Sequence, residues 1–148
     1  MQSLYLSTAT ILLGGVLLAI QSPLNAQLNK AVGSPVNAAL ISFLVGTVAL
    51  SMLAAAQRIA PNDAQTRELP WYAWAGGLCG AVFVTAAAYA APRLGVATML
   101  SLAIASQLIT ALLLDHFGAL GIPQHPVSAG RIAGMALVIL GVIVVRKY

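Results

Sequence analysis

Residues 20–30 read IQSPLNAQLNK, and this stretch decides how the rest of the chain is interpreted. It closes a run from Leu4 in which small hydroxyls are almost the only polar side chains. Its four side-chain amides and its proline therefore fall at the end of a segment long enough to cross a membrane. Amides at membrane depth are costly unless they hydrogen-bond or line a cavity. The stretch predicts either a site that handles a polar molecule or a lock between helices.

Composition places the chain in the membrane. Only 7% of its 148 residues are charged, against about 25% in a soluble domain. The mean hydropathy is +0.94. The formal net charge of +4 comes from basic residues that stand singly between apolar segments, as lipid-headgroup anchors do. This spacing indicates the lipid bilayer as a partner and argues against nucleic acid.

The apolar segments predict an all-α membrane protein, with residues 1–148 forming a single five-span domain. The expected spans are approximately 6–29, 36–56, 70–91, 96–114 and 128–145. Pro23 predicts a kink or a local opening in the first span. Ser34 and Pro35 form a cap and first position for the second span. A polar loop, residues 57–69, follows that span.

Three amides in the first span recur every four residues and share one helix face: Gln21, Asn25 and Asn29. Gln27 faces away. We expect Gln21 near the middle of the membrane, Asn25 toward one side and Asn29 at the interface. Cavity lining and a bond between helices are equally supported for Gln21 and Asn25. For Gln107, in the middle of the fourth span, the lock is favoured.

Two aromatic side chains are further substrate-path candidates. Trp74 and Tyr89 have the chemistry to stack on a cationic or aromatic ligand. Aromatic residues at the ends of a span are also typical anchors at the lipid headgroups. The anchor is the favoured interpretation for Trp74, and Tyr89 fits the same role at the other end of its span.

Asp115 is the only acidic residue near a span. It is either a coupling or cation site, or a helix-end anchor paired with Arg93 or Arg131, and the anchor is favoured. His116 and His125 are interpreted as interfacial polar residues, because no Cys or Glu completes a metal site. We therefore expect no metal and no cofactor. Since no nucleophile–base pair or phosphate loop is evident, we expect no enzyme activity.

Glycines at helical spacing predict close helix packing. One pair lies in the third span and a set of three shares a face of the fifth; they are Gly76 and Gly80, then Gly130, Gly134 and Gly141. For the fifth span, packing within the chain and packing across a dimer both remain open. We predict the dimer contact.

Basic residues barely favour one orientation. With five spans, the side of the N-terminus carries three and the other side carries four: Arg58, Arg67 and Arg131, then Lys30, Arg93, Arg146 and Lys147. Membrane orientation follows the asymmetry of Lys and Arg. Such a chain can insert both ways and pair antiparallel. A single orientation fixed by Arg146 and Lys147 is equally supported.

Several motifs, in this order and spacing, resemble the small YdcZ-type proteins of the drug/metabolite transporter superfamily. They are QSPLNAQL at 21–28, AALISFLVG at 38–46, PW at 70–71 with GGLCG at 76–80, PRLG at 92–95, QLIT at 107–110 leading to LDHFG at 114–118, and Arg131 with Gly134. Ser106 stands where that family carries a glycine, which changes the expected packing there.

The resemblance implies a five-span exporter of a bacterial inner membrane, similar to one half of a ten-span transporter. Members of the family are believed to work as antiparallel pairs, either with an identical copy or with an oppositely oriented homologue. The substrate is expected to be a small molecule whose identity the resemblance does not supply. The alternative function is a non-transporting subunit that stabilises or regulates another membrane protein.

Related four-span exporters place a glutamate in span one, where this chain has Gln21 and Asn25. Amides do not titrate. Exchange of a proton for a cation at this position is therefore not supported.

Overall fold

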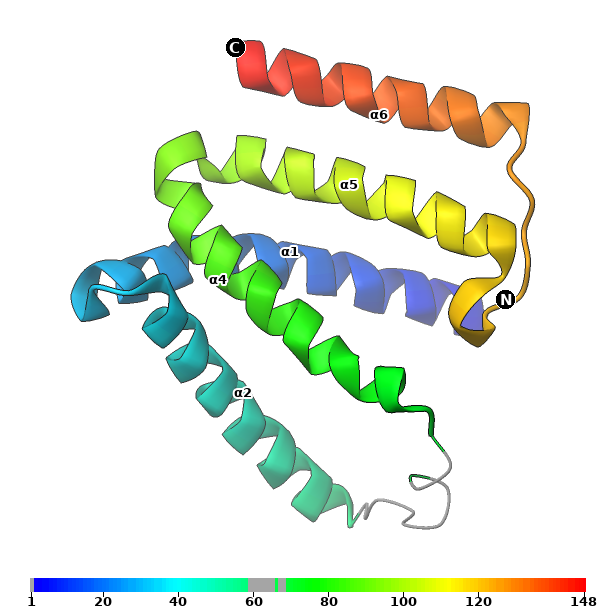
Figure 1. Cartoon of the computed structure of the whole chain (residues 1–148). Coiled ribbons are helices and arrows are strands. Elements are labelled where there is room, and N and C mark those ends of the chain that lie inside the picture. Colours follow the sequence, from blue (N-terminus) through cyan, green and yellow to red (C-terminus); the bar gives the residue numbers. More distant parts are fainter. Residues whose placement is uncertain (1, 59–65, 67–68) are drawn as a thin grey trace. The chain divides into compact units, whose positions relative to one another are not determined.

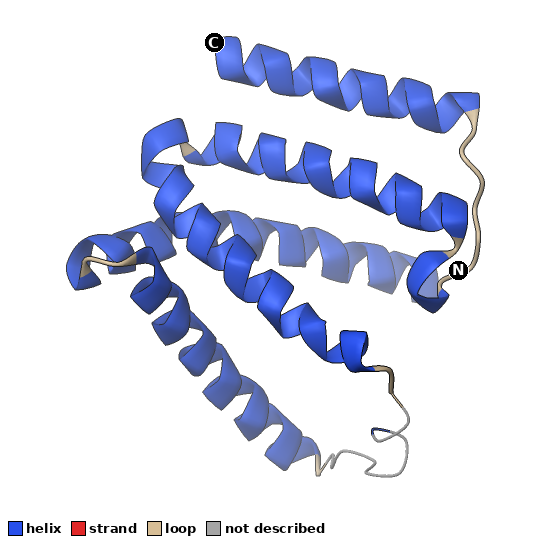
Figure 2. Cartoon of the chain, in the orientation of Figure 1, coloured by secondary structure: helices blue, strands red, loops and turns tan. Residues whose placement is uncertain are grey.

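The structure, a computed structural model, describes residues 2–58, 66 and 69–148, and its secondary structure in that part is helical (Figures 1 and 2). Five described segments are long and apolar enough to cross a membrane. They are α1 (Gln2–Val32), α2 (Pro35–Gln57), α4 (Gly76–Leu94) continuing from the 3-10 turn η1 (Trp71–Ala75), α5 (Val96–Phe117) and α6 (Ala129–Lys147). The predicted all-α, five-span fold is confirmed. Arg67 of the polar loop lies outside the described residues.

Local chemistry explains where the helices begin and end. Glycines with positive φ follow α1, α4 and α5: Gly33 at 69°, Gly95 at 80° and Gly118 at 59°. Glycine adopts this conformation without the steric cost that a Cβ atom adds. At the start of α2, the Ser34 hydroxyl accepts from the Asn37 amide at 3.3 Å, and Pro35 takes the first helical position as predicted.

The prolines do not end the helices that contain them. α1 continues through Pro23 to Val32, and the kink or local opening expected at Pro23 stays a prediction. α4 continues through Pro92 to Leu94, beyond the predicted end at residue 91. A proline within a helix leaves one carbonyl without its donor. For Pro92 that carbonyl belongs to Ala88, and a side chain of α1 supplies the missing donor, as described below.

The described helices group into two compact units, Met1–Arg93 and Leu94–Tyr148. In the first unit, α2 turns away from α1 at Gly33 and Ser34 (Figure 1). Its buried apolar side chains are mostly small: Ala26, Ala38, Ala39, Val84, Ala87, Ala88 and Ala91. Small side chains let helix backbones approach closely. The resulting van der Waals packing stabilises helix contacts in lipid, where the hydrophobic effect does not drive helices together.

In the second unit, α5 and α6 form an antiparallel hairpin (Figure 1). The turn η2 (Ala119–Gly121) begins the loop between them. At the far end of this loop, the Ser128 hydroxyl accepts from the Arg131 amide at 3.3 Å and caps α6. The hairpin therefore has defined ends at both of its helices.

Large apolar side chains point outward from helices of both units. Leu12, Leu50 and Leu137 are 66%, 68% and 70% exposed. In water, so many exposed leucines would drive aggregation. In a bilayer they face lipid, while the helices satisfy their own backbone hydrogen bonds. The chain is therefore in contact with the lipid bilayer over most of its helical surface.

Candidate functional site

The amide face of α1 runs from the middle of the membrane toward one surface. Measured along the axis from the middle of the span Tyr5–Val32, Gln21 lies about 4 Å, Asn25 about 10 Å and Asn29 about 16 Å away. Half of the hydrocarbon core is about 15 Å thick. With this span centred in the bilayer, Gln21 and Asn25 would lie within the hydrocarbon region and Asn29 at its boundary.

Asn29 is a lock between helices. Its side-chain nitrogen donates to the backbone carbonyl of Ala88 in α4 at 3.2 Å. Ala88 is four residues before Pro92, so its carbonyl has no helical donor of its own. The amide of Asn29 supplies that donor, and this bond ties α1 to α4. The sequence assigned Asn29 only to the interface and missed this partner.

Asn25 lies deeper and has no such partner. The residue is only 3% exposed, and its side chain makes no hydrogen bond within the described part of the chain. Every fully buried side-chain nitrogen or oxygen among the described residues does have a partner. The amide of Asn25 is therefore nearly, but not completely, buried.

Gln21 lies in a groove between α1 and α2. The groove has a volume of about 220 Å³, and its lining also includes Ser42, Phe43, Gly46, Thr47 and Leu50. Gln21 and Gly46 are both about 17 Å from the turn that joins the two helices. Ser42, Gly46 and Thr47 are small residues of the kind that suits close helix contact, and here they leave space beside an amide.

The hydrogen-bonding groups of this groove are only partly used. The Thr47 hydroxyl donates to the Phe43 carbonyl at 2.8 Å, so its oxygen keeps acceptor capacity alone. Gln21 and Ser42 make no side-chain hydrogen bond to any residue that the structure describes. The groove therefore presents unpaired donors and acceptors at the level of the membrane core.

Tyr89 already holds a cation from its own helix. The guanidinium of Arg93 lies over the Tyr89 ring, 3.6 Å from the ring centroid, and also donates to the Tyr89 carbonyl. Arg93 therefore stacks on the ring face that a cationic ligand would need. Trp74 is 65% exposed in η1, at the start of the third span. Both aromatics lie at span ends, where headgroup anchors are found.

Gln107 belongs to the second unit, in the middle of α5. Its side chain is exposed and makes no hydrogen bond to a described residue. The hydroxyls around it bond to their own helix: Ser106 donates to the Ala103 carbonyl and Thr110 to the Ser106 carbonyl. Within this unit Gln107 does not bond to α6, so the predicted lock has no partner there.

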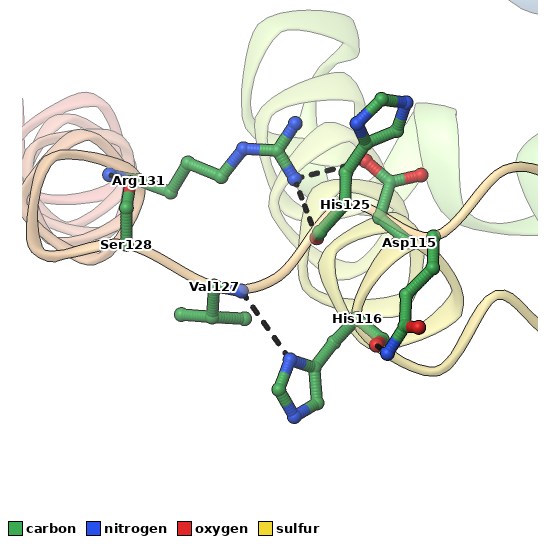
Figure 3. A network of polar contacts seen from close by, with 7 residues as sticks. Asp115, His116, His125, Val127, Ser128 and Arg131 are labelled. Carbon is green, nitrogen blue, oxygen red and sulfur yellow. Dashed lines mark hydrogen bonds and ion pairs between the residues drawn. The ribbon is translucent and has the colours of Figure 1, made fainter.

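Asp115 pairs with Arg131 across the hairpin of the second unit (Figure 3). The carboxylate lies 3.1 Å from the guanidinium of Arg131, which also donates to the His125 carbonyl at 3.3 Å. The His125 amide donates to the Asp115 carbonyl at 2.7 Å. Of the two predicted partners, Arg131 is therefore the one that pairs, and Arg93 is occupied elsewhere.

The rest of the network folds the loop against the end of α5. The Val127 amide donates to Nδ1 of His116 at 3.3 Å, and Gln124 donates to the His116 carbonyl at 2.8 Å (Figure 3). The bond from Gln124 uses a carbonyl that the end of a helix leaves unpaired, and the bond from Val127 uses the imidazole ring. Among the described residues, no group of three His, Cys, Asp or Glu side chains is placed to hold a metal.

The glycines predicted to pack closely differ in their surroundings: Gly80 of the first unit has a close neighbour, and the glycines of α6 do not. A Cβ atom at Gly80 would lie 3.3 Å from the Phe43 ring, so α2 approaches α4 closely there. The contacting group is a ring and not the backbone that the sequence suggested. Gly76, Gly134 and Gly141 have no described atom within 4 Å of that position, and the nearest to Gly130 is the Ser128 hydroxyl at 4.0 Å. Within their own unit, the glycines of α6 therefore have space around them, and Gly134 lines a groove beside α5.

Comparison with known proteins covers all five spans. Residues 6–144 match the family described as "Putative inner membrane exporter, YdcZ". The chain belongs to the YdcZ family of the drug/metabolite transporter superfamily. It is also 30% identical, over 143 residues, to the inner membrane protein YdcZ of Escherichia coli (strain K12), covering 96% of this chain and 95% of that protein. No solved structure matches the chain.

Membership in the YdcZ family confirms two predictions together. The resemblance seen in the sequence motifs is correct, and the chain is a multi-pass protein of a bacterial inner membrane. The description of the family supports a membrane transporter. It is not an enzyme family.

Sequence reasoning missed three contacts that shape the site. They are the bond from Asn29 to Ala88, the burial of Ser22 beside Asn25, and the stacking of Arg93 on Tyr89. Two of them had a local signal. Pro92 predicts an unpaired carbonyl at Ala88, four residues earlier in the helix. Arg93 follows Tyr89 by four residues, about one turn of helix, which predicts that their side chains lie close together.

Proposed function

We propose that this YdcZ-family chain exports a small molecule across the inner membrane and works as a dimer, with its substrate path beside the amide face of α1. The observation that carries the proposal is Asn25. Its amide lies within the hydrocarbon region, is nearly buried and makes no hydrogen bond to a described residue. Burying such an amide in lipid costs free energy unless a polar molecule hydrogen-bonds to it.

The contrast with Asn29 supports a path at Asn25 and Gln21. A residue that only joins two helices should be hydrogen-bonded in the protein without ligand, and Asn29 is hydrogen-bonded in this way to α4. Gln21, four residues before Asn25, lines a groove with unpaired polar groups. Substrate sites of membrane transporters lie near the bilayer midplane, which is the depth of Gln21.

The chemistry of this path sets limits on coupling. Gln21 and Asn25 hydrogen-bond but do not exchange protons. Asp115 is a carboxylate, but it lies in the last turn of α5 and pairs with Arg131. We therefore assign Asp115 to anchoring the hairpin and assign no proton-for-cation exchange to the amide face.

The open glycine face of α6 supports a dimer. Gly134 lines a groove beside α5, and a Cβ atom at Gly134 or Gly141 would meet no described atom within 4 Å, which leaves room for another helix. The near balance of basic residues on the two sides supports pairing of opposite orientations. Labelling Tyr148→Cys with an impermeant reagent, from each side of the membrane, tests this. Labelling from both sides is expected for an antiparallel homodimer, and labelling from one side only contradicts it.

Transport is tested with purified protein in liposomes loaded with a mixture of bacterial metabolites. Compounds released faster than from protein-free liposomes are identified by mass spectrometry. We expect at least one small molecule to leave selectively. Release indistinguishable from that of empty liposomes, with the protein folded and dimeric, would instead favour the non-transporting subunit.

A further inference from the structure

We infer that the groove between α1 and α2 binds a small, uncharged molecule that carries both hydrogen-bond donors and acceptors, such as an amide or an alcohol. This inference rests on the proposed export function, because it names the chemical class of its substrate. It is carried by the lining of the groove, its size and its distance from any charge.

The lining contains polar groups but no charged one. Among the described lining residues, the polar side chains are the amide of Gln21 and the hydroxyls of Ser42 and Thr47. The amide offers two N–H donors and a carbonyl, and Ser42 offers a donor and an acceptor. Because the Thr47 proton is used by the Phe43 carbonyl, that oxygen can only accept. Phe43 and Leu50 add an apolar wall.

The described charged side chains of the same unit are distant from the groove. Lys30 lies about 14 Å beyond Gln21 along the axis of α1, and Arg58 lies about 12 Å beyond Leu50 along α2. Arg93 lies in the last turn of α4 and stacks on Tyr89. A charged ligand at this depth would therefore be stripped of water without a counter-ion, which is strongly unfavourable. An uncharged ligand replaces its water with the amide and hydroxyl groups.

The volume sets the size of the ligand. A groove of about 220 Å³ lies below the range of about 300–1,000 Å³ that holds drug-sized molecules. It corresponds to about seven water molecules at about 30 Å³ each. The groove is therefore of a size that holds a small metabolite.

Cysteine labelling tests this selectivity without a known substrate. The protein is placed in nanodiscs, which leave both membrane faces open, after Cys79→Ala removes its single thiol. Ser42→Cys then puts a thiol in the groove. It is treated with three methanethiosulfonates that differ in charge: 2-hydroxyethyl, 2-aminoethyl and 2-sulfonatoethyl. Each rate is divided by the rate at Tyr148→Cys, which is 95% exposed, to remove differences in intrinsic reactivity.

We expect the neutral hydroxyethyl reagent to react at Ser42→Cys at least tenfold faster than either charged reagent. Similar rates for all three would overturn the inference, and so would no reaction with any of them. The matched control is Leu44→Cys on the outer side of α2, where Leu44 is 56% exposed. If that thiol reacts equally fast, the neutral reagent arrives through lipid and the inference fails.

A second variant changes the charge of the groove. Gln21→Glu keeps the shape of the side chain and adds a carboxylate, so the aminoethyl reagent is expected to gain about tenfold at Ser42→Cys, whereas Gln21→Leu gives no gain. An unchanged rate with Gln21→Glu contradicts the placement of this residue in the groove. The labelling reads the groove whether or not any compound is exported. Failure of the inference and failure of the export function therefore give separate results.

Discussion

Replacing Asn29 by alanine removes the donor that reaches the Ala88 carbonyl at 3.2 Å. In an ordinary helix, that carbonyl would keep a backbone donor and the loss would be small. Here residue 92 is proline, so the carbonyl keeps no helical donor. We therefore predict that the cost of Asn29→Ala depends on what stands at position 92.

The size of the stability loss depends on whether the Ala88 carbonyl keeps a hydrogen-bond donor after Asn29 is replaced. Hydrogen bonds between membrane helices average about 0.6 kcal/mol and reach about 1.7 kcal/mol. Leaving a buried group unsatisfied costs about 1–3 kcal/mol. We expect Asn29→Ala to lower the free energy of unfolding by about 1.5 kcal/mol. With Pro92→Ala present, the new backbone N–H satisfies the carbonyl, and the cost falls to about 0.5 kcal/mol.

Equilibrium unfolding of the four proteins of this cycle, in mixed micelles with increasing SDS, measures the coupling. The expected coupling free energy is about 1 kcal/mol. Gln27→Ala is the matched control, because Gln27 is an exposed amide on the same helix, and it should change stability by less than about 0.5 kcal/mol. Additive costs for Asn29→Ala and Pro92→Ala, within about 0.3 kcal/mol, would refute the reasoning.

Three further substitutions test other parts of the structure. Exchanging the two charges, by Asp115→Arg together with Arg131→Asp, should leave the hairpin at least as stable as before, because each charge then interacts favourably with the dipole of its own helix. Either single substitution should lower stability by up to about 1 kcal/mol in thermal unfolding. Gly134→Leu should leave the protein inserted but monomeric in cross-linking. Gly80→Leu should displace Phe43 and cost about 1–3 kcal/mol in the same unfolding assay.

Matched variants exist for these tests. Ala136→Leu lies on a different face of α6 from Gly134 and should stay dimeric. Gly76→Leu meets no described atom within 4 Å and should be close to neutral. A loss of stability in the charge-exchanged protein would contradict the ion pair between Asp115 and Arg131. An unchanged cross-linked dimer with Gly134→Leu would contradict the dimer contact. Equal effects of the substitutions at Gly76 and Gly80 would contradict the contact between Gly80 and Phe43.

Much of the fold follows from the sequence, because lipid imposes simple requirements. Each apolar segment must be a helix of about 20 residues, so the number of spans is set by composition. The predicted boundaries differ from the structure by up to four residues for the first helix, which begins at Gln2 and not at residue 6. At their C-terminal ends, three helices continue three residues beyond the predicted positions 29, 91 and 114, to Val32, Leu94 and Phe117. The helices stop at glycines with positive φ, and Pro92 does not stop α4.

The site was less predictable, because it depends on which helices meet. Helical spacing placed Gln21, Asn25 and Asn29 on one face, but it did not distinguish a lock from a cavity. That distinction comes from the partner across the helix pair: Ala88 for Asn29, and no described residue for Asn25. Similarly, either Arg93 or Arg131 had the charge to pair with Asp115, and only the hairpin geometry decides for Arg131.

The most direct test of the central claim compares export by two proteins of equal dimer content. One carries Gln21→Leu and Asn25→Leu, and the other carries Gln27→Leu as the control on the opposite face. For a compound that the unmodified protein releases from liposomes, the initial rate should fall at least tenfold in the first protein and remain unchanged in the second. A normal rate in the double variant would contradict a substrate path along the amide face of α1.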